Sequence, residues 1–209
     1  MASVMQTVFS TPAFRNRYNY STAQTHIQTC DKGLPADCIE CQMIKLADGL
    51  LSARYSHPAK SPPEQQSDDQ PIFQEGIRPA QFKTLIGKGH EEFATMRQQD
   101  SEEFLQHLLS RLRKEAKHQG RSEDTEATDI FRFGMEQKLQ CGGCRRVGYK
   151  VDEVDLASLP VSAIEKVTED GKKIYEEVQL EECLDALCGE EQLADYACSV
   201  CGTKVLAEK

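Results

Sequence analysis

The sequence predicts an α+β protein in which a helical part is followed by a part rich in β-strands. Apolar residues recur at helical spacing through residues 1–122 and alternate with polar residues in residues 123–209. Two Cys-x-x-Cys pairs, CGGC and CSVC, lie beside the strand-like sequence. We therefore expect two domains, 1–122 and 123–209, in a chain long enough to bury a real core.

The composition is typical of an intracellular globular protein, in the cytoplasm, the nucleus or both. Hydrophobic residues make up 39% of the chain and charged residues 28%, and no apolar run reaches membrane-spanning length. The N-terminus lacks the features of a signal peptide. A formal net charge of -9 disfavours nucleic acid as a partner, because binding a phosphate backbone requires a basic face. Nine cysteines in such a protein indicate metal binding or buried thiols before disulfides.

Two core helices are predicted in the first 55 residues. The first has an apolar stripe from Val4 to Phe9 and is stopped by Pro12. Residues 15–32 have no clear period and are interpreted as irregular. The second helix lies within LPADCIECQMIKLADGLLSARY, with Pro35 in its first turn and apolar residues from Ile39 to Leu50 at i, i+4, i+7 and i+11.

Two further helices follow a polar insertion. Residues 56–71 carry four prolines and few apolar residues, which predicts a flexible surface insertion. The third helix runs through PAQFKTLI, with Gly87 as a left-handed cap. The fourth lies in RQQDSEEFLQHLLSRLRKEAKHQG, where Asp100 and Glu103 have capping-box spacing and Gly120 supplies the stop.

The C-terminal part begins with two strands joined by a cysteine turn. In FRFGMEQKLQ apolar residues from Phe131 to Leu139 alternate with polar ones, and the alternation returns between Val147 and Val151. Residues 164–177 are acidic and predict a loop, and EECLDALCG predicts a short helix.

The paired cysteine turns predict one structural zinc ion. Cys141 and Cys144 form one turn, and Cys198 and Cys201 form the other. Each turn places two sulfurs on one side, and four thiolates complete a tetrahedral site with no open position for water. The alternative, two unrelated pairs of buried thiols, is less favoured because paired Cys-x-x-Cys turns are a strong metal signal.

A second group of possible ligands is His26, Cys30, Cys38 and Cys41. We interpret its cysteines as small buried thiols instead, because Cys38 and Cys41 fall on the predicted helix and the other two residues fall in irregular sequence. Among the histidines, His107 is expected on the exposed side of the fourth helix. His90 lies in a loop flanked by glycines, where a bracing hydrogen bond is the favoured role.

The sequence resembles the ubiquitin-specific proteases. RQQDSEEFLQHLL is similar to their Gln-Gln-Asp box, and SVMQTVFSTPAFRNRY is similar to the helix that follows their nucleophile. GIRPAQFKTLIGKGHEEFATMRQQD and DCIECQMIKLADGLLSARYS resemble the isopeptidase T branch, which disassembles unanchored polyubiquitin chains. The resemblance implies part of a papain-like cysteine protease fold, with residues 1–122 as a helical thumb and residues 123–209 as β-rich, zinc-ribbon fingers.

The resemblance also implies which residues bind ubiquitin. The family uses the Asp and Glu of the box, here Asp100 and Glu103, to hold the ubiquitin tail, and Gln99 belongs to the same box. Spacing alone favours helix capping for the two acids, and both roles are compatible. This chain has Ser101-Glu102 where the commonest box has Ala-Gln, which adds an acid and removes neither of the two.

The residues that would perform catalysis are expected outside these 209 residues. In the family a Gly-Asn-x-Cys segment precedes the first helix, and the general-base histidine lies in a palm after the fingers. We therefore expect part of a thiol-dependent deubiquitinase that is inactive by itself. The alternative is a catalytically inactive protein that binds ubiquitin or polyubiquitin, and a zinc ribbon that binds nucleic acid is disfavoured by the acidic balance.

Overall fold

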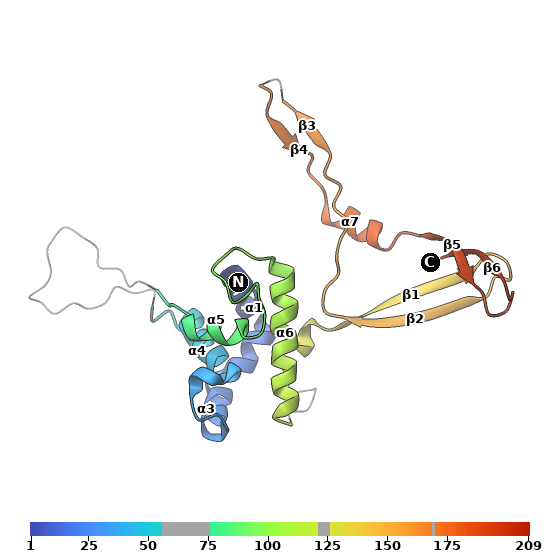
Figure 1. The fold of residues 1–209 in the computed structure, drawn as a ribbon. Coiled ribbons are helices and arrows are strands. Elements are labelled where there is room, and N and C mark those ends of the chain that lie inside the picture. Colours follow the sequence, from blue (N-terminus) through green and yellow to red (C-terminus); the bar gives the residue numbers. More distant parts are fainter. Residues whose placement is uncertain (56–75, 121–125, 169) are drawn as a thin grey trace, which may run out of the picture. The chain divides into compact units, whose positions relative to one another are not determined.

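The computed structural model describes residues 1–55, 76–120, 126–168 and 170–209. The chain forms two compact units, Met1–Ile130 and Phe131–Lys209, which we call the helical unit and the sheet unit (Figure 1). The predicted insertion at 56–71 lies outside the described residues. Residues 121–125 also lie outside the described residues, so the predicted domain boundary after residue 122 remains a proposal. In the described ranges, no helix has the length and apolar character needed to cross a bilayer.

The helical unit contains six α-helices and short 3-10 turns in its described part. The helices are α1 (Ala2–Ser10), α2 (Pro12–Arg15), α3 (Tyr20–Thr29), α4 (Ile39–Leu51), α5 (Ala80–Gly87) and α6 (Ser101–His118), and the turns are η1 (Asn16–Tyr18) and η2 (Pro35–Asp37). A further turn, η5 (Asp129–Phe131), spans the boundary between the two units. The core of the helical unit consists of large apolar side chains from these helices and from the segment before α6. Those with almost no exposed surface are Phe9, Phe14, Met43, Ile86, Phe93, Phe104, Leu108 and Leu109.

Helix α3 corrects the prediction that residues 15–32 are irregular. Asn19 caps its N-terminus, because the side-chain oxygen accepts a hydrogen bond of 3.0 Å from the backbone N–H of Thr22. His26 is its one buried side chain, while Tyr20 and Ile27 are 78% and 65% exposed. A helix that buries a histidine in place of an apolar stripe gives no periodic signal, which explains the wrong prediction.

Two details of the helix ends also differ from the prediction. Cys38 lies outside α4 as its N-cap, and Pro35 belongs to the separate turn η2. Gly87 is the last residue of α5, and the left-handed residue is Gly89, with a φ of 80°. Gly87 is needed for space, because a Cβ there would lie 2.7 Å from the carbonyl oxygen of Phe93.

The sheet unit holds a four-stranded antiparallel sheet in the order β2-β1-β6-β5. Its strands are β1 (Phe133–Cys141), β2 (Val147–Val154), β5 (Gln192–Ala197) and β6 (Lys204–Glu208). Residues 164–177, predicted as a loop, contain a hairpin of β3 (Glu165–Val167) and β4 (Lys173–Tyr175), whose six residues are all exposed. The short helix α7 (Leu180–Leu187) forms as predicted.

The sheet unit has almost no apolar core. Among its described residues the buried side chains are Cys141, Cys183, Cys198 and Ala207. Tyr149 and Val151 on β2, predicted as an apolar face, are 64% and 60% exposed. Small units without a hydrophobic core depend on disulfides or metal ions, and every cysteine in this chain is a free thiol.

Candidate functional site

Four cysteines of the sheet unit converge at one end of its strands. Cys141 ends β1, Cys144 follows it, and Cys198 and Cys201 lie between β5 and β6. We call them the sheet cluster. Their sulfur atoms all lie within 4.8 Å of one another, with 3.8 Å between Cys141 and Cys201 and 3.6 Å between Cys144 and Cys198. The structure therefore brings together the four predicted ligands, and this cluster could hold a metal ion.

Backbone geometry explains the two glycines in CGGC. A Cβ on Gly142 would lie 2.7 Å from the carbonyl oxygen of Leu206, to which the Gly142 N–H donates a hydrogen bond of 2.8 Å. A Cβ on Gly143 would lie 3.2 Å from the sulfur of Cys201. Small residues therefore allow the turn to approach both β6 and the opposite sulfurs.

Backbone amides point at the first sulfur of each turn. The N–H of Cys144 donates to the sulfur of Cys141 at 3.5 Å, and the N–H of Cys201 donates to that of Cys198 at 3.4 Å. Hydrogen bonds from Cys201 and Val200 amides lower the pKa of Cys198 to about 6. Hydrogen bonds with Cys144 and Cys198 raise the pKa of Cys201 to about 12. Binding of a metal cation would displace the proton of the Cys201 thiol, since cysteine binds metals as the thiolate.

A second cluster, which sequence analysis did not favour as a site, lies in the helical unit. It consists of His26, Cys30, Cys38 and Cys41, and we call it the helix cluster. One ligand atom from each residue lies within 4.8 Å of the others, so this cluster could also hold a metal ion. Burial, with hydrogen bonds to Cys30 and Cys38, raises the pKa of Cys41 to about 12.

The predicted substrate-binding acids lie at the N-terminus of α6. Asp100 is the N-cap, and its Oδ1 accepts hydrogen bonds from the backbone N–H groups of Glu102 at 2.7 Å and Glu103 at 3.0 Å. Both carboxylates are exposed, and within the described part of the chain Oδ2 of Asp100 accepts no hydrogen bond. Gln99 braces the preceding loop by donating to the Glu92 carbonyl at 3.2 Å.

Two histidines pack behind these acids. His90 stacks on Phe93 with ring centroids 4.1 Å apart, and its Nε2 lies 3.7 Å from Oε1 of Glu103. His107 is half-buried, contrary to its predicted exposure, and its Nε2 lies 2.8 Å from the Ile86 carbonyl oxygen. Burial lowers the pKa of His107, although this hydrogen bond opposes the shift. The imidazole pair thus supports the start of α6, and its position could not be read from helical spacing.

The family model and the known proteins that this chain is similar to carry the same family description. A family model described as ubiquitin carboxyl-terminal hydrolase matches residues 1–197. Ubiquitin carboxyl-terminal hydrolase 14 of Schizosaccharomyces pombe is 36% identical over 98% of this chain and 25% of its own length. Human ubiquitin carboxyl-terminal hydrolase 5 is 32% identical over 99% of this chain and 26% of its own. The chain thus spans about a quarter of the length of these relatives.

A solved structure supports the fold. It is a chain of the SAGA DUB module, which contains Ubp8, Sgf11, Sus1 and Sgf73 and is bound to monoubiquitin. The TM-score is 0.63 at 21% sequence identity, and the match covers 100% of this chain and 41% of the other. With the cysteine cluster in the sheet unit, this likeness confirms the predicted fold class, a helical part followed by β-rich fingers.

Replacing Asp100 separates its capping role from its charge. Asp100→Ala should lower the free energy of unfolding of the helical unit by about 1 kcal/mol, because two backbone N–H groups of α6 lose their acceptor. Asp100→Asn should cost only a few tenths, because Asn still caps. Urea unfolding followed by circular dichroism measures both, with Ser101→Ala as the neighbouring control. Equal stability of the Ala and Asn variants would contradict the capping role.

Proposed function

The chain belongs to the ubiquitin carboxyl-terminal hydrolase family, and on this premise we propose that it forms the ubiquitin-tail-binding part of a thiol-dependent deubiquitinase. The observation that carries the proposal is the pair of exposed carboxylates at the start of α6. Such an enzyme hydrolyses the bond after the C-terminal glycine of ubiquitin. The substrates we propose are unanchored polyubiquitin chains, on the resemblance to the isopeptidase T branch.

The α6 acids suit an extended, basic peptide. The ubiquitin tail carries arginines, and a guanidinium binds a carboxylate through charge-assisted hydrogen bonds. Asp100 is fixed by its two capping hydrogen bonds through Oδ1, which leaves Oδ2 for a partner. Glu103 lies near His90, and Gln99 holds the loop that leads into the helix. An acid already ordered by the backbone loses little rotamer freedom when it binds.

The nucleophile of this deubiquitinase would come from a segment other than these nine cysteines. Seven of them lie in the two clusters, Cys183 is buried, and Cys188 is exposed at the end of α7. The bound tail would be positioned by this chain, while a thiolate and an imidazole supplied elsewhere attack the carbonyl and transfer the proton. A noncatalytic ubiquitin-binding role is the second candidate, and it would use the same exposed carboxylates at the start of α6.

We also propose that the sheet cluster holds a structural zinc ion. Four thiol ligands are typical of zinc, and four-thiolate coordination supplies structure without an open position for catalysis. The residues fit this ion, because the sulfurs are 3.6 and 3.8 Å apart across the two turns. For tetrahedral zinc with Zn–S distances of about 2.3 Å, the expected sulfur separation is about 3.8 Å. Free thiols as ligands fit a reducing compartment, the cytoplasm or nucleus.

Removing one ligand tests the zinc proposal. Cys198→Ser should lower the zinc content by one ion per chain and loosen the sheet unit, which has almost no apolar core of its own. Zinc is measured by mass spectrometry of metals on reduced protein after gel filtration. Cys188→Ser removes an exposed thiol outside both clusters and should leave the zinc content unchanged. Unchanged zinc in the Cys198→Ser protein would rule out the sheet cluster as its site.

Removing the α6 charges tests ubiquitin binding. Asp100→Asn should weaken ubiquitin binding about tenfold, because a charge-assisted hydrogen bond contributes about 1.5–3 kcal/mol. The helix should remain capped, so thermal unfolding serves as the fold control. Glu102→Gln removes a neighbouring charge and should change the affinity less than about twofold, as expected for an exposed charge outside the site. Calorimetry giving unaltered affinity for the Asp100→Asn, Glu103→Gln double variant would refute the tail-binding site.

The position of the cysteines predicts binding without turnover. The 209-residue chain should release no fluorophore from a ubiquitin amide and should not react with a ubiquitin electrophile, because seven of its nine thiols lie in the two clusters, Cys183 is buried and Cys188 lies at the end of α7. A family member with its nucleophile serves as the positive control. Thiol-dependent turnover that survives repurification would mean that one of the nine cysteines is the nucleophile.

A further inference from the structure

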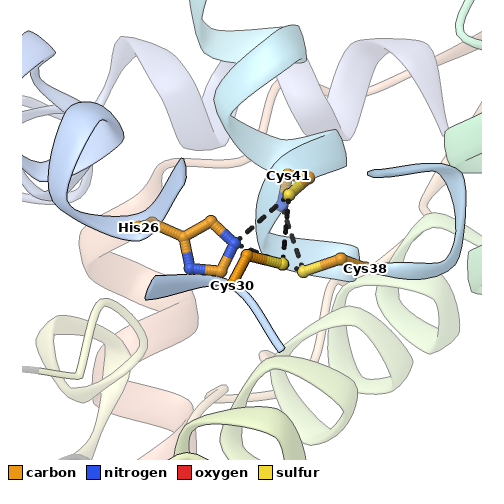
Figure 2. A group of neighbouring side chains, drawn as sticks. All are labelled: His26, Cys30, Cys38 and Cys41. Atoms are coloured by element: carbon orange, nitrogen blue, oxygen red, sulfur yellow. Dashed lines mark hydrogen bonds between the residues drawn. The ribbon is translucent and has the colours of Figure 1, made fainter. Parts of the chain in front are cut away.

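The helix cluster joins the end of one helix to the start of the next. Figure 2 shows its four side chains pointing toward one another. His26 lies in the last turns of α3 and Cys30 is the C-cap of that helix. Cys38 is the N-cap of α4 and Cys41 lies in its first turn. The spacing is His-x3-Cys followed by Cys-x2-Cys, and two such short pairs are the usual composition of a structural zinc site.

The distances inside the cluster are those of ligands around one ion. Nε2 of His26 lies 3.3 Å from the sulfur of Cys38 and 3.3 Å from that of Cys41. The sulfurs of Cys41 and Cys30 are 3.7 Å apart. Tetrahedral zinc with Zn–S of about 2.3 Å and Zn–N of about 2.0 Å would separate sulfur from sulfur by about 3.8 Å and nitrogen from sulfur by about 3.5 Å.

A single hydrogen bond does not explain the position of the Nε2 atom of His26 between two sulfurs. A ring nitrogen offers either one N–H or one lone pair, so it serves one strong hydrogen bond at a time. Nε2 of His26 is nevertheless equally close to two sulfurs, at 3.3 Å each. An atom equidistant from two neighbours is expected when all three surround a common centre.

The cysteine turn repeats the geometry of the sheet cluster. The backbone N–H of Cys41 donates to the sulfur of Cys38 at 3.5 Å, as the second cysteine of each sheet-cluster turn does at 3.5 and 3.4 Å. Amide hydrogen bonds of this kind stabilise a metal-bound thiolate by offsetting its charge. Three Cys-x-x-Cys turns in one chain thus have the same local structure.

Helix α3 buries little of its own surface. His26 is its one buried side chain, and the helix is otherwise exposed or half-buried. Binding of His26 and Cys30 to the same ion as Cys38 and Cys41 would attach α3 to α4. An open hollow lined by His26, Cys30 and Asp31 provides a path for the ion.

We propose that His26, Cys30, Cys38 and Cys41 form a second metal site, which binds zinc and fastens the C-terminus of α3 to the N-terminus of α4. Three thiolates and an imidazole are soft and borderline ligands, which select zinc over magnesium or calcium. With all four positions filled, the ion is structural. The site is independent of ubiquitin binding, so failure of either proposal leaves the other standing.

Zinc content tests the second site directly in the full 209-residue chain. The reduced protein should contain about two zinc ions per chain, one for each cluster. The double variant Cys38→Ser, Cys41→Ser should contain one, which Cys198→Ser then removes, while Cys188→Ser should retain both. A wild-type chain with a single zinc ion that Cys198→Ser abolishes would overturn the proposal, as would two ions in the Cys38→Ser, Cys41→Ser protein.

A variant that keeps four metal-ligand atoms distinguishes loss of the metal from failure of the chain to fold. In the cobalt-substituted protein, His26→Cys should retain two ions and increase the sulfur-to-cobalt charge-transfer absorption, because one nitrogen ligand becomes a thiolate. His26→Ala should leave the helix cluster with three protein ligands and weaken its hold on cobalt. Retention of the wild-type spectrum by both variants would show that His26 is not a ligand and overturn the proposal.

Discussion

The close approach of the four sulfurs in the sheet cluster is the constraint on which the sheet unit depends. The two contacts join residues 60 and 54 positions apart in the sequence, and the pairing of β1 with β6 covers only two residue pairs beside them. Among the described residues of this unit four side chains are buried; three of these are cysteines, and two of the three belong to the cluster. Closing such a long loop lowers the conformational entropy of the chain. The binding free energy of a metal ion would offset this loss, which a hydrophobic core would otherwise have to offset.

The helical unit combines apolar packing with the ligation that we propose for the helix cluster. Phenylalanine and leucine side chains fill its centre, so α6 is held in the ordinary way by an apolar face. Helix α3 is different, because its inward side chain is a histidine that meets three thiols. The acids proposed for ubiquitin therefore stand on an element fixed by packing, with the cap of Asp100 adding local order. Binding residues on rigid elements are positioned more accurately than those on loops.

Local patterns predicted the parts of this structure that are themselves local. The cap at Asp100, the stop at Gly120 and the two cysteine turns of the sheet each depend on a few neighbouring residues. The four residues of the helix cluster were named from the sequence but interpreted as buried thiols, because periodicity detects only apolar burial and α3 buries His26 instead. The apolar stripe of α4 also made Cys38 look helical, although the helix begins one residue later, at Ile39, and Cys38 is its N-cap. The β3–β4 hairpin gave no signal because both of its faces are exposed.

We propose that metal ligation by both clusters organises this chain, and X-ray absorption at the zinc edge tests this most directly. The sheet cluster would contribute four sulfurs, and the helix cluster three sulfurs and one nitrogen, giving seven sulfurs and one nitrogen for two ions. The expected spectrum shows a first coordination shell dominated by sulfur at about 2.3 Å, with a minor imidazole nitrogen contribution at about 2.0 Å. A shell of oxygen and nitrogen, or of sulfur with no imidazole contribution, would contradict it.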